Sequence, residues 1–251
     1  MKTTHALSIL KRTAFLTFSL LIIASCEDDN DTDVAQSITD DETQMIITST
    51  MTGQGGEISE IKTTAAARDQ AKSLNEFTPL EDLSCNESVS ISWSNQNQVG
   101  DRSWSFQNDW SWELICDFQN LEGEYQVNGN GTLDSQGPNL IKQVDKTKDF
   151  NLSGFGLSST VWVYQADHER NANYQFLVGN QNTIDVNIDL LAEDILIDKQ
   201  TQFITSGTYT IDITRTNSNG NFNSRGAVIV FNGNQTATVT LDNGITFDIS
   251  W

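Results

Sequence analysis

The alternation of apolar and polar residues after residue 84 is the clearest pattern in the chain. It begins in the segment Val89–Trp93, where apolar residues alternate with serines, and rows of the same period recur up to the last residue. A period of two is typical of antiparallel strands with one buried and one solvated face. Asn232-Gly233-Asn234 and Asp242-Asn243-Gly244 supply the positive φ angles of tight hairpin turns. The pattern predicts an all-β fold, an antiparallel β-sandwich or barrel, over residues 85–251.

Polar segments interrupt the alternation and predict turns. Asn95–Gln98 and Asn128–Asn139 are rich in the residue types that favour turns. Asp167–Asn171 lies between two apolar runs and predicts a hairpin with a charged tip. His168 stands at that tip, so we expect it to be solvated.

Residues 45–84 follow a different pattern and precede the β domain. The run Met45–Met51 predicts a short strand. Ser59–Leu74 predicts a short helix, because a serine can cap it and its alanines are good helix formers. The apolar face of this helix is thin, so we expect it on the domain surface or between the domain and the segment before it.

Residues 1–25 combine a basic start with a short apolar core. The basic residues are Lys2, Lys11 and Arg12, and the apolar run covers residues 14–23. A spanning helix needs about 20 apolar residues, so this run is too short to be one. The run ends in Ile23-Ala24-Ser25-Cys26.

These four residues resemble the lipobox of bacterial type II signal peptides, which has a branched aliphatic residue, a small residue, Gly/Ala/Ser and then Cys. The resemblance implies removal of residues 1–25 and lipidation of Cys26 by a diacylglyceryl group and an N-acyl chain. More than one acyl chain makes membrane attachment effectively permanent. The membrane is therefore the first expected partner of this protein.

Residues 26–44 form an acidic segment that we expect to be a disordered tether. Acidic residues directly after the lipidated cysteine resemble the export signals of Bacteroidota surface lipoproteins, and the strand-turn-strand ending of the chain is also similar to such proteins. These resemblances imply an outer-membrane location, facing the periplasm or the cell surface. They imply no activity.

Charge excludes one class of partner. The chain has 14 basic and 34 acidic residues and a formal net charge of −20. Removal of residues 1–25 takes away three basic and no acidic residues, which makes the balance more acidic. Nucleic-acid binding depends on the neutralisation of phosphates by Lys and Arg, so we expect no nucleic-acid partner.

The chain has three cysteines. Lipidation of Cys26 leaves the pair Cys85 and Cys116, which predicts a disulfide in an oxidising compartment. Two reduced, buried thiols are the alternative. Two thiols alone do not make a structural zinc site, which needs four ligands.

Four tryptophans gather within about twenty residues, and they are the one enrichment that favours ligand binding: Trp93, Trp104, Trp110 and Trp112. Aromatic rings on a sheet can stack on sugar rings while nearby Asn and Gln side chains bind the hydroxyl groups. The competing interpretation is that the rings fill the core, because large aromatics dominate core packing.

Catalytic motifs are scarce. His168 is the one histidine after residue 25, so a two-histidine metal site is excluded and no metal or cofactor is expected. Glycoside hydrolysis needs only two carboxylates about 5–10 Å apart, and Glu113, Glu122 and Glu124 are candidates. We therefore expect a non-catalytic binding or scaffold domain with a glycan or protein ligand. The alternatives are a lipid-anchored hydrolase such as a glycosidase and a carrier with a large apolar cavity.

Overall fold

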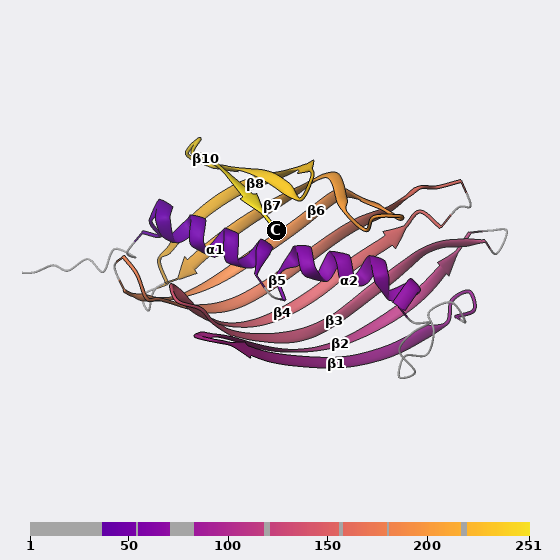
Figure 1. Ribbon diagram of the computed structural model, residues 1–251, viewed down its shortest axis with the longest axis horizontal. Helices are drawn as coiled ribbons and strands as arrows, with labels where there is room; N and C mark the ends of the chain where they lie inside the picture. Colours follow the sequence, from indigo (N-terminus) through magenta and orange to yellow (C-terminus); the bar gives the residue numbers. More distant parts are fainter. Residues whose placement is uncertain are drawn as a thin grey trace, which may run out of the picture. The chain divides into compact units, whose positions relative to one another are not determined.

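In the part of the chain that the structure describes, ten antiparallel strands form one sheet, and each strand pairs with the next one along the chain (Figure 1). The computed structural model describes residues 37–53, 55–70, 83–117, 121–155, 158–179, 181–216 and 220–251. The strands are β1 (Ser88–Val99), β2 (Arg102–Cys116), β3 (Glu122–Gln136), β4 (Leu140–Ser153), β5 (Val161–Phe176), β6 (Thr183–Asp198), β7 (Ile204–Thr216), β8 (Phe222–Gly233), β9 (Thr236–Leu241) and β10 (Thr246–Ser250). The all-β antiparallel fold predicted from the alternation is confirmed. In the described residues β1 and β10 are the sheet edges, and the sheet is not closed into a barrel.

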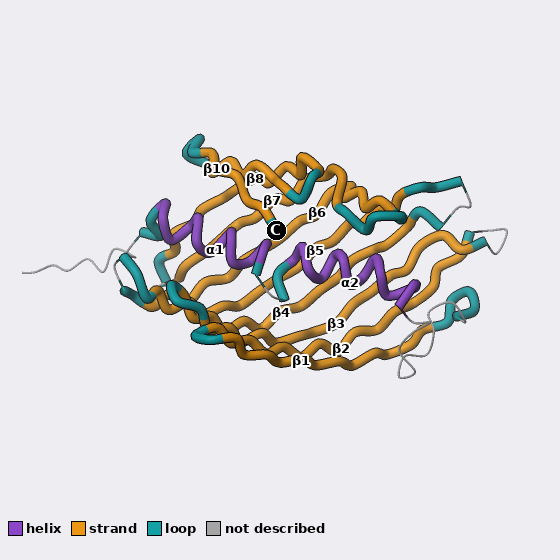
Figure 2. The backbone as a smooth tube through the Cα atoms, in the orientation of Figure 1, coloured by secondary structure: helices purple, strands orange, loops and turns teal. Residues whose placement is uncertain are grey.

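The sheet curves around two helices, which lie across its concave face (Figures 1 and 2). The central strands bury side chains of one face; the burial in β5, for example, alternates from Trp162 to Phe176. The buried side chains of the strands and of both helices form one hydrophobic cluster. The concave side is therefore the core, and the convex side is the solvated face.

The strand predicted at Met45–Met51 is wrong, because this run belongs to helix α1 (Asp40–Thr52). Thr39 caps the helix: its hydroxyl accepts from the Glu42 N–H, and the Glu42 carboxylate accepts from the Thr39 N–H. This reciprocal pair is a capping box. The acidic tether expected over residues 26–44 therefore ends earlier than predicted. Residues 1–36 lie outside the described residues, so the signal peptide and Cys26 do too.

Helix α2 (Glu57–Gln70) confirms the predicted helix, which starts two residues earlier than expected. One side of the helix packs in the core, where Ile58, Ile61 and Ala65 are buried, while Ser59 and Thr63 are exposed. Residues 71–82, which include the predicted end of this helix, lie outside the described residues. None of the described helices is long and apolar enough to cross a membrane.

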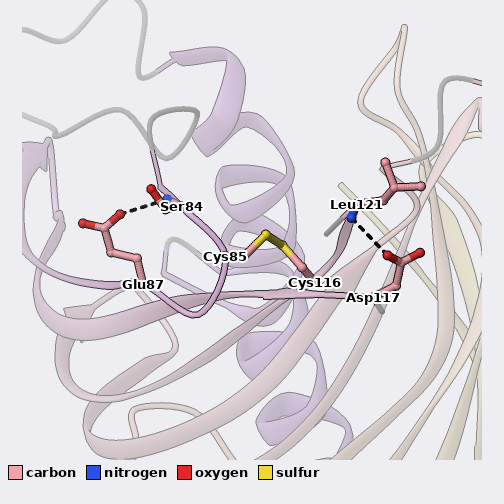
Figure 3. The surroundings of a disulfide bond; sticks show 6 residues. All are labelled: Ser84, Cys85, Glu87, Cys116, Asp117 and Leu121. Atoms are coloured by element: carbon pink, nitrogen blue, oxygen red, sulfur yellow. Dashed lines mark hydrogen bonds between the residues drawn. A yellow bond between two sulfur atoms is a disulfide. The ribbon is translucent and has the colours of Figure 1, made fainter. Parts of the chain in front are cut away.

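Cys85 and Cys116 form the predicted disulfide, with their Cα atoms 5.4 Å apart (Figure 3). The bond joins the segment before β1 to the last residue of β2. Local hydrogen bonds order the chain on both sides of it. The Ser84 N–H donates to Glu87, and the Leu121 N–H donates to Asp117. The edge strand β1 is thus covalently attached to its one neighbour.

The turn predicted at Asn95–Gln98 is wrong, because these residues belong to β1 and pair with residues 103–106 of β2. The hairpin tip predicted at Asp167–Asn171 is also wrong. These residues lie in the middle of β5, where each of them pairs with β4 on one side and with β6 on the other. His168 and Arg170 continue the inward phase of Ala166 and Ala172, and both are 1 % exposed. The predicted solvated histidine is therefore a buried one on the concave face.

Candidate functional site

A cluster of buried charged residues lies between α2 and the sheet. Glu57, the first residue of α2, is fully buried. Its carboxylate accepts hydrogen bonds from His168 Nδ1 at 3.0 Å, from Tyr209 Oη at 3.0 Å and from Lys148 Nζ at 3.4 Å, and also from Arg170 Nη2. A carboxylate at a helix N-terminus is further stabilised by the helix dipole. Glu57 therefore attaches the start of α2 to β4, β5 and β7.

Glu60 lies one turn later and makes the second attachment. Its carboxylate forms ion pairs with Lys146 and Lys148, and Arg170 Nη2 lies 3.9 Å from its Oε2. Because Glu57 and Glu60 are three residues apart, they occupy the same side of the helix. We refer to these two glutamates with Lys146, Lys148, His168 and Arg170 as the ionic cluster.

The cluster sets the charge state of its members. Burial acts to raise the pKa of Glu57, but Arg170, Lys148 and His168 lower it well below its ordinary value of 4.5. Burial lowers the pKa of His168 to about 4, and Lys148 and Arg170 act in the same direction against Glu57. At neutral pH Glu57 is thus ionised and His168 is neutral, with its Nδ1–H donated to Glu57.

The neutral state of His168 predicts a pH-dependent stability. An unfolded histidine titrates near 6.5 and the folded one near 4, so the unfolded chain takes up the proton first. The stabilisation is complete above about pH 6.5 and is lost as the pH falls toward 4. From pH 7 to pH 5 we expect the free energy of unfolding to fall by about 2 kcal/mol. Urea denaturation across this range measures the loss.

His168→Gln is the control for this prediction, because glutamine keeps a donor for Glu57 and does not titrate. The slope between pH 7 and pH 5 should be much shallower in this variant. Equal slopes in the two proteins would show that another group causes the pH dependence. Carboxyl groups contribute little to the slope between pH 7 and pH 5, because their ordinary pKa values lie below this range.

Two glycines in β3 make room for neighbouring groups, Gly131 for Lys146 of β4 and Gly129 for Trp110 of β2. A β-carbon on Gly131 would lie 2.7 Å from Lys146 Cε and 2.3 Å from Asn108 Oδ1, and one on Gly129 would lie 2.7 Å from Trp110 Cδ1. All three distances are shorter than a normal van der Waals contact. The pair Gly129 and Gly131, which the sequence suggests as part of a turn, is instead a packing feature of a strand.

Lys142 lies outside the ionic cluster at the end of α1. It is 4 % exposed, and its Nζ donates to the Ser49 carbonyl at 2.9 Å. That carbonyl is in the last turn of the helix, where the C=O groups lack intrahelical partners. Burial lowers the pKa of Lys142 to about 7, and Arg170 and Lys146 add to the effect. No carboxylate among the described residues forms an ion pair with Lys142.

A groove of about 1010 Å³ lies between α1 and the β1–β4 end of the sheet. Met45, Thr48 and Ser49 of α1 form one wall. The sheet supplies the other side with one cross-strand row, in which Asn97 pairs with Trp104, Trp104 with Ser135, and Ser135 with Lys142. Directly paired residues point to the same face of a sheet. The row thus places an amide, an indole, a hydroxyl and an ammonium group side by side along the groove.

The four tryptophans of the sequence analysis separate into two groups. Trp110 and Trp112 are 3 % and 2 % exposed and lie in the core. Trp93 is half-buried and packs edge-on against Trp110, with ring centroids 4.3 Å apart. Trp104 is half-buried, lines the groove and lies nearly parallel to Phe106, with an interplanar angle of 9° and a centroid distance of 5.6 Å. Of the four, Trp104 is the one placed to meet a ligand in the groove.

In comparisons with known proteins, no family model, no curated protein and no solved structure matches this chain. A functional proposal therefore rests on the chemistry of the groove and of the ionic cluster.

The candidate carboxylates of the sequence analysis are not brought together at the groove. Glu113 and Glu124 take the outward phase of β2 and β3, opposite to Trp112 and Tyr125. The side chain of Glu122 lies outside the described residues. In the described part of the chain, no group of three or more His, Cys, Asp or Glu residues could hold a metal ion.

Sequence reasoning missed the ionic cluster, although two signals for it exist. Glu57 and Glu60 have the same helical spacing as Ile58 and Ile61, so the apolar and acidic pairs are neighbours on one helix. His168 and Arg170 stand in phase with the buried positions of β5. Each signal is ambiguous alone, because charged residues are rarely buried unless they are paired.

Proposed function

We propose that this protein is a non-catalytic binding protein of the bacterial cell envelope, held in the outer membrane by lipid on Cys26, and that its ligand is a glycan. The observation that carries the glycan proposal is the groove with Trp104 in its floor. The anchor rests on the lipobox-like residues Ile23-Ala24-Ser25-Cys26.

The composition of the groove suits a sugar. The C–H face of a pyranose ring is apolar and matches the face of an indole, while its hydroxyl groups need hydrogen-bond partners. Trp104 supplies the aromatic surface, and Asn97, Ser103, Ser135 and Gln136 supply polar groups around it. Ligand sites commonly have volumes of about 300–1000 Å³ and a few placed polar groups. The groove is therefore large enough for a short oligosaccharide.

Binding fits the groove better than hydrolysis. A glycosidase needs two carboxylates about 5–10 Å apart at the scissile bond. Asp41 is the one carboxylate among the described residues that line the groove. Glu57 and Glu60 form a close pair, but both are buried and engaged by cations. The alternative of a lipid-anchored hydrolase thus has no support from the groove.

Trp104→Ala should abolish most of the glycan binding. We expect the affinity to fall about thirtyfold, because a tryptophan at the centre of a binding site typically contributes 2 kcal/mol or more. A glycan array probed with residues 27–251, followed by calorimetry on the retained glycan, measures this change. Phe222→Ala is the matched control, since Phe222 is an aromatic residue that is 73 % exposed and lies outside the groove. Absence of any retained glycan for the unmodified protein would refute the glycan proposal.

Cys26→Ala should abolish lipidation and release the protein from the membrane fraction. The lipobox resemblance makes the Cys26 thiol the acceptor of the diacylglyceryl group, so no other residue can replace it. Metabolic labelling with an alkyne fatty acid and cell fractionation provide the two readouts. Ser25→Ala is the control, because alanine also satisfies the motif and should leave labelling unchanged. Persistent labelling of Cys26→Ala would rule out this anchor.

A further inference from the structure

The concave side of the sheet carries more positive than negative charge. Lys142, Lys146, Lys148 and Arg170 are all buried there, whereas Glu57 and Glu60 are the carboxylates that pair with them in the described chain. The two glutamates engage Lys146, Lys148 and Arg170, and Lys142 has no counter-charge among the described residues. A buried cation without a paired anion is costly. The groove thus contains a positive group that lacks its negative partner.

A second cation lies at the same groove. Arg102, the first residue of β2, lines it and is exposed. It makes no ion pair with any described residue. Arg102 precedes Trp104 by two positions, so the two side chains take the same face of β2. Asp41, the one lining carboxylate, is outnumbered by Arg102 and Lys142.

The register fixes the spacing between these groups. Lys142 is two strands from Trp104, with Ser135 between them, which corresponds to about 10 Å between backbones. Arg102 is two residues from Trp104 along the strand, or about 7 Å. A sugar ring stacked on Trp104 therefore has a cation in reach on two sides. The overall charge of the chain is −20, so this positive lining is a local exception.

From these observations we infer that the groove selects acidic saccharides, whose pyranose ring stacks on Trp104 and whose carboxylate or sulfate group pairs with Lys142 and Arg102. This inference rests on the proposed glycan function and names the class of glycan. The bound anion supplies the counter-charge that Lys142 lacks. The lowered pKa of Lys142 is consistent with that missing partner.

The test compares saccharides that differ only in charge. Oligogalacturonic acid and its methyl ester share one backbone, and only the acid carries a free carboxylate; dextran sulfate and dextran make the same comparison for sulfate. Binding to residues 27–251 is measured by calorimetry. We expect at least one charged form to bind, and its neutral counterpart to bind about tenfold more weakly or worse, since hydrogen bonds to charged groups contribute about 1.5–3 kcal/mol.

Two variants locate the effect. Arg102→Gln changes an exposed residue and should weaken binding of the charged saccharide about fivefold. Lys142→Met removes the buried charge and should weaken binding about tenfold or more; its fold is checked by circular dichroism. Lys62→Gln is the control, because it removes one positive charge outside the groove.

The outcomes separate the two proposals. Equal affinity for charged and neutral saccharides through Trp104, or no effect of Arg102→Gln and Lys142→Met, would overturn the preference for acids and leave glycan binding intact. Absence of binding to every saccharide would overturn both.

Discussion

Replacing Glu57 with glutamine should lower the free energy of unfolding by about 3–5 kcal/mol, the loss expected when one partner of a buried ion pair is removed. Glu57 is fully buried and bonded to Lys148, His168, Arg170 and Tyr209. Glutamine has nearly the same shape as glutamate, so the loss of unfolding free energy measures the contribution of the negative charge. Urea denaturation followed by tryptophan fluorescence measures it.

Glu193→Gln is the matched control. It removes the same charge from an exposed position on the convex side and should change stability by less than about 0.5 kcal/mol. The double variant Glu57→Gln/Arg170→Met should recover part of the loss, because it also removes the orphaned cation. A loss below about 1 kcal/mol in Glu57→Gln would show that the ionic cluster does not hold α2 in place.

The ionic cluster also matters for the groove. Helix α1 forms one wall of the groove, and only a short connection separates it from α2. By attaching the start of α2, Glu57 fixes the point where the two helices meet. The Ser49 carbonyl near that point receives the Lys142 hydrogen bond. The wall of the groove is therefore positioned by buried charge and hydrogen bonds, in addition to the apolar side of α1.

The period-two pattern predicted the strand segments in which one face is solvated and the other carries apolar side chains. It failed where inward positions carry no apolar side chain. In β5 the inward residues His168 and Arg170 are charged or polar, and the segment was therefore predicted to be a turn. In β3 the inward positions are Gly129 and Gly131, and glycines favour turns, so Asn128–Asn139 was also predicted to contain turns. The partners that make these positions possible, Glu57 and the lysines of β4, are far away in sequence.

Helix α1 shows the opposite error, because a segment predicted as a strand is a helix. Its buried residues are Glu42, Thr43, Ile46, Ile47, Thr50 and Met51, which have helical spacing only if the glutamate and the two threonines are counted as inward. Thr50 is buried because its hydroxyl bonds to Tyr174 Oη at 3.1 Å. β-Branched residues favour strands locally, so Met45–Met51 taken alone indicates a strand. The capping box at Thr39 and Glu42 was the signal that could have decided the question.

Trp104 was among the predicted site residues, but sequence alone could not separate it from Trp93, Trp110 and Trp112. All four take the inward phase of β1 or β2. Trp104 differs because it lies toward the groove end of β2, beyond the core that covers Trp110 and Trp112. Lys142 could not be predicted as its neighbour, since its proximity depends on the register of β2, β3 and β4.

Removing the disulfide should cost about 3–4 kcal/mol of stability. Cys85 and Cys116 are 31 residues apart, and a loop of that length gives about this value in the chain-entropy model. Cys85→Ala/Cys116→Ala should therefore show a lower urea midpoint than the oxidised protein. The unmodified protein measured with a reducing agent is the matched comparison and should approach the double variant.

The loss of stability should be concentrated in β1, because the disulfide attaches this edge strand to β2. Among the described strands β1 pairs with β2 alone, and its inward residues Val89, Ile91 and Trp93 are only partly buried. Without the bond, amide hydrogen exchange should accelerate in β1 before it accelerates in β5, which has a neighbour on each side. Since Asn97 of β1 forms the outer end of the groove row, fraying of this strand would also loosen the ligand side of the groove. Uniform acceleration across all ten strands would instead mean that the disulfide acts only on the unfolded chain.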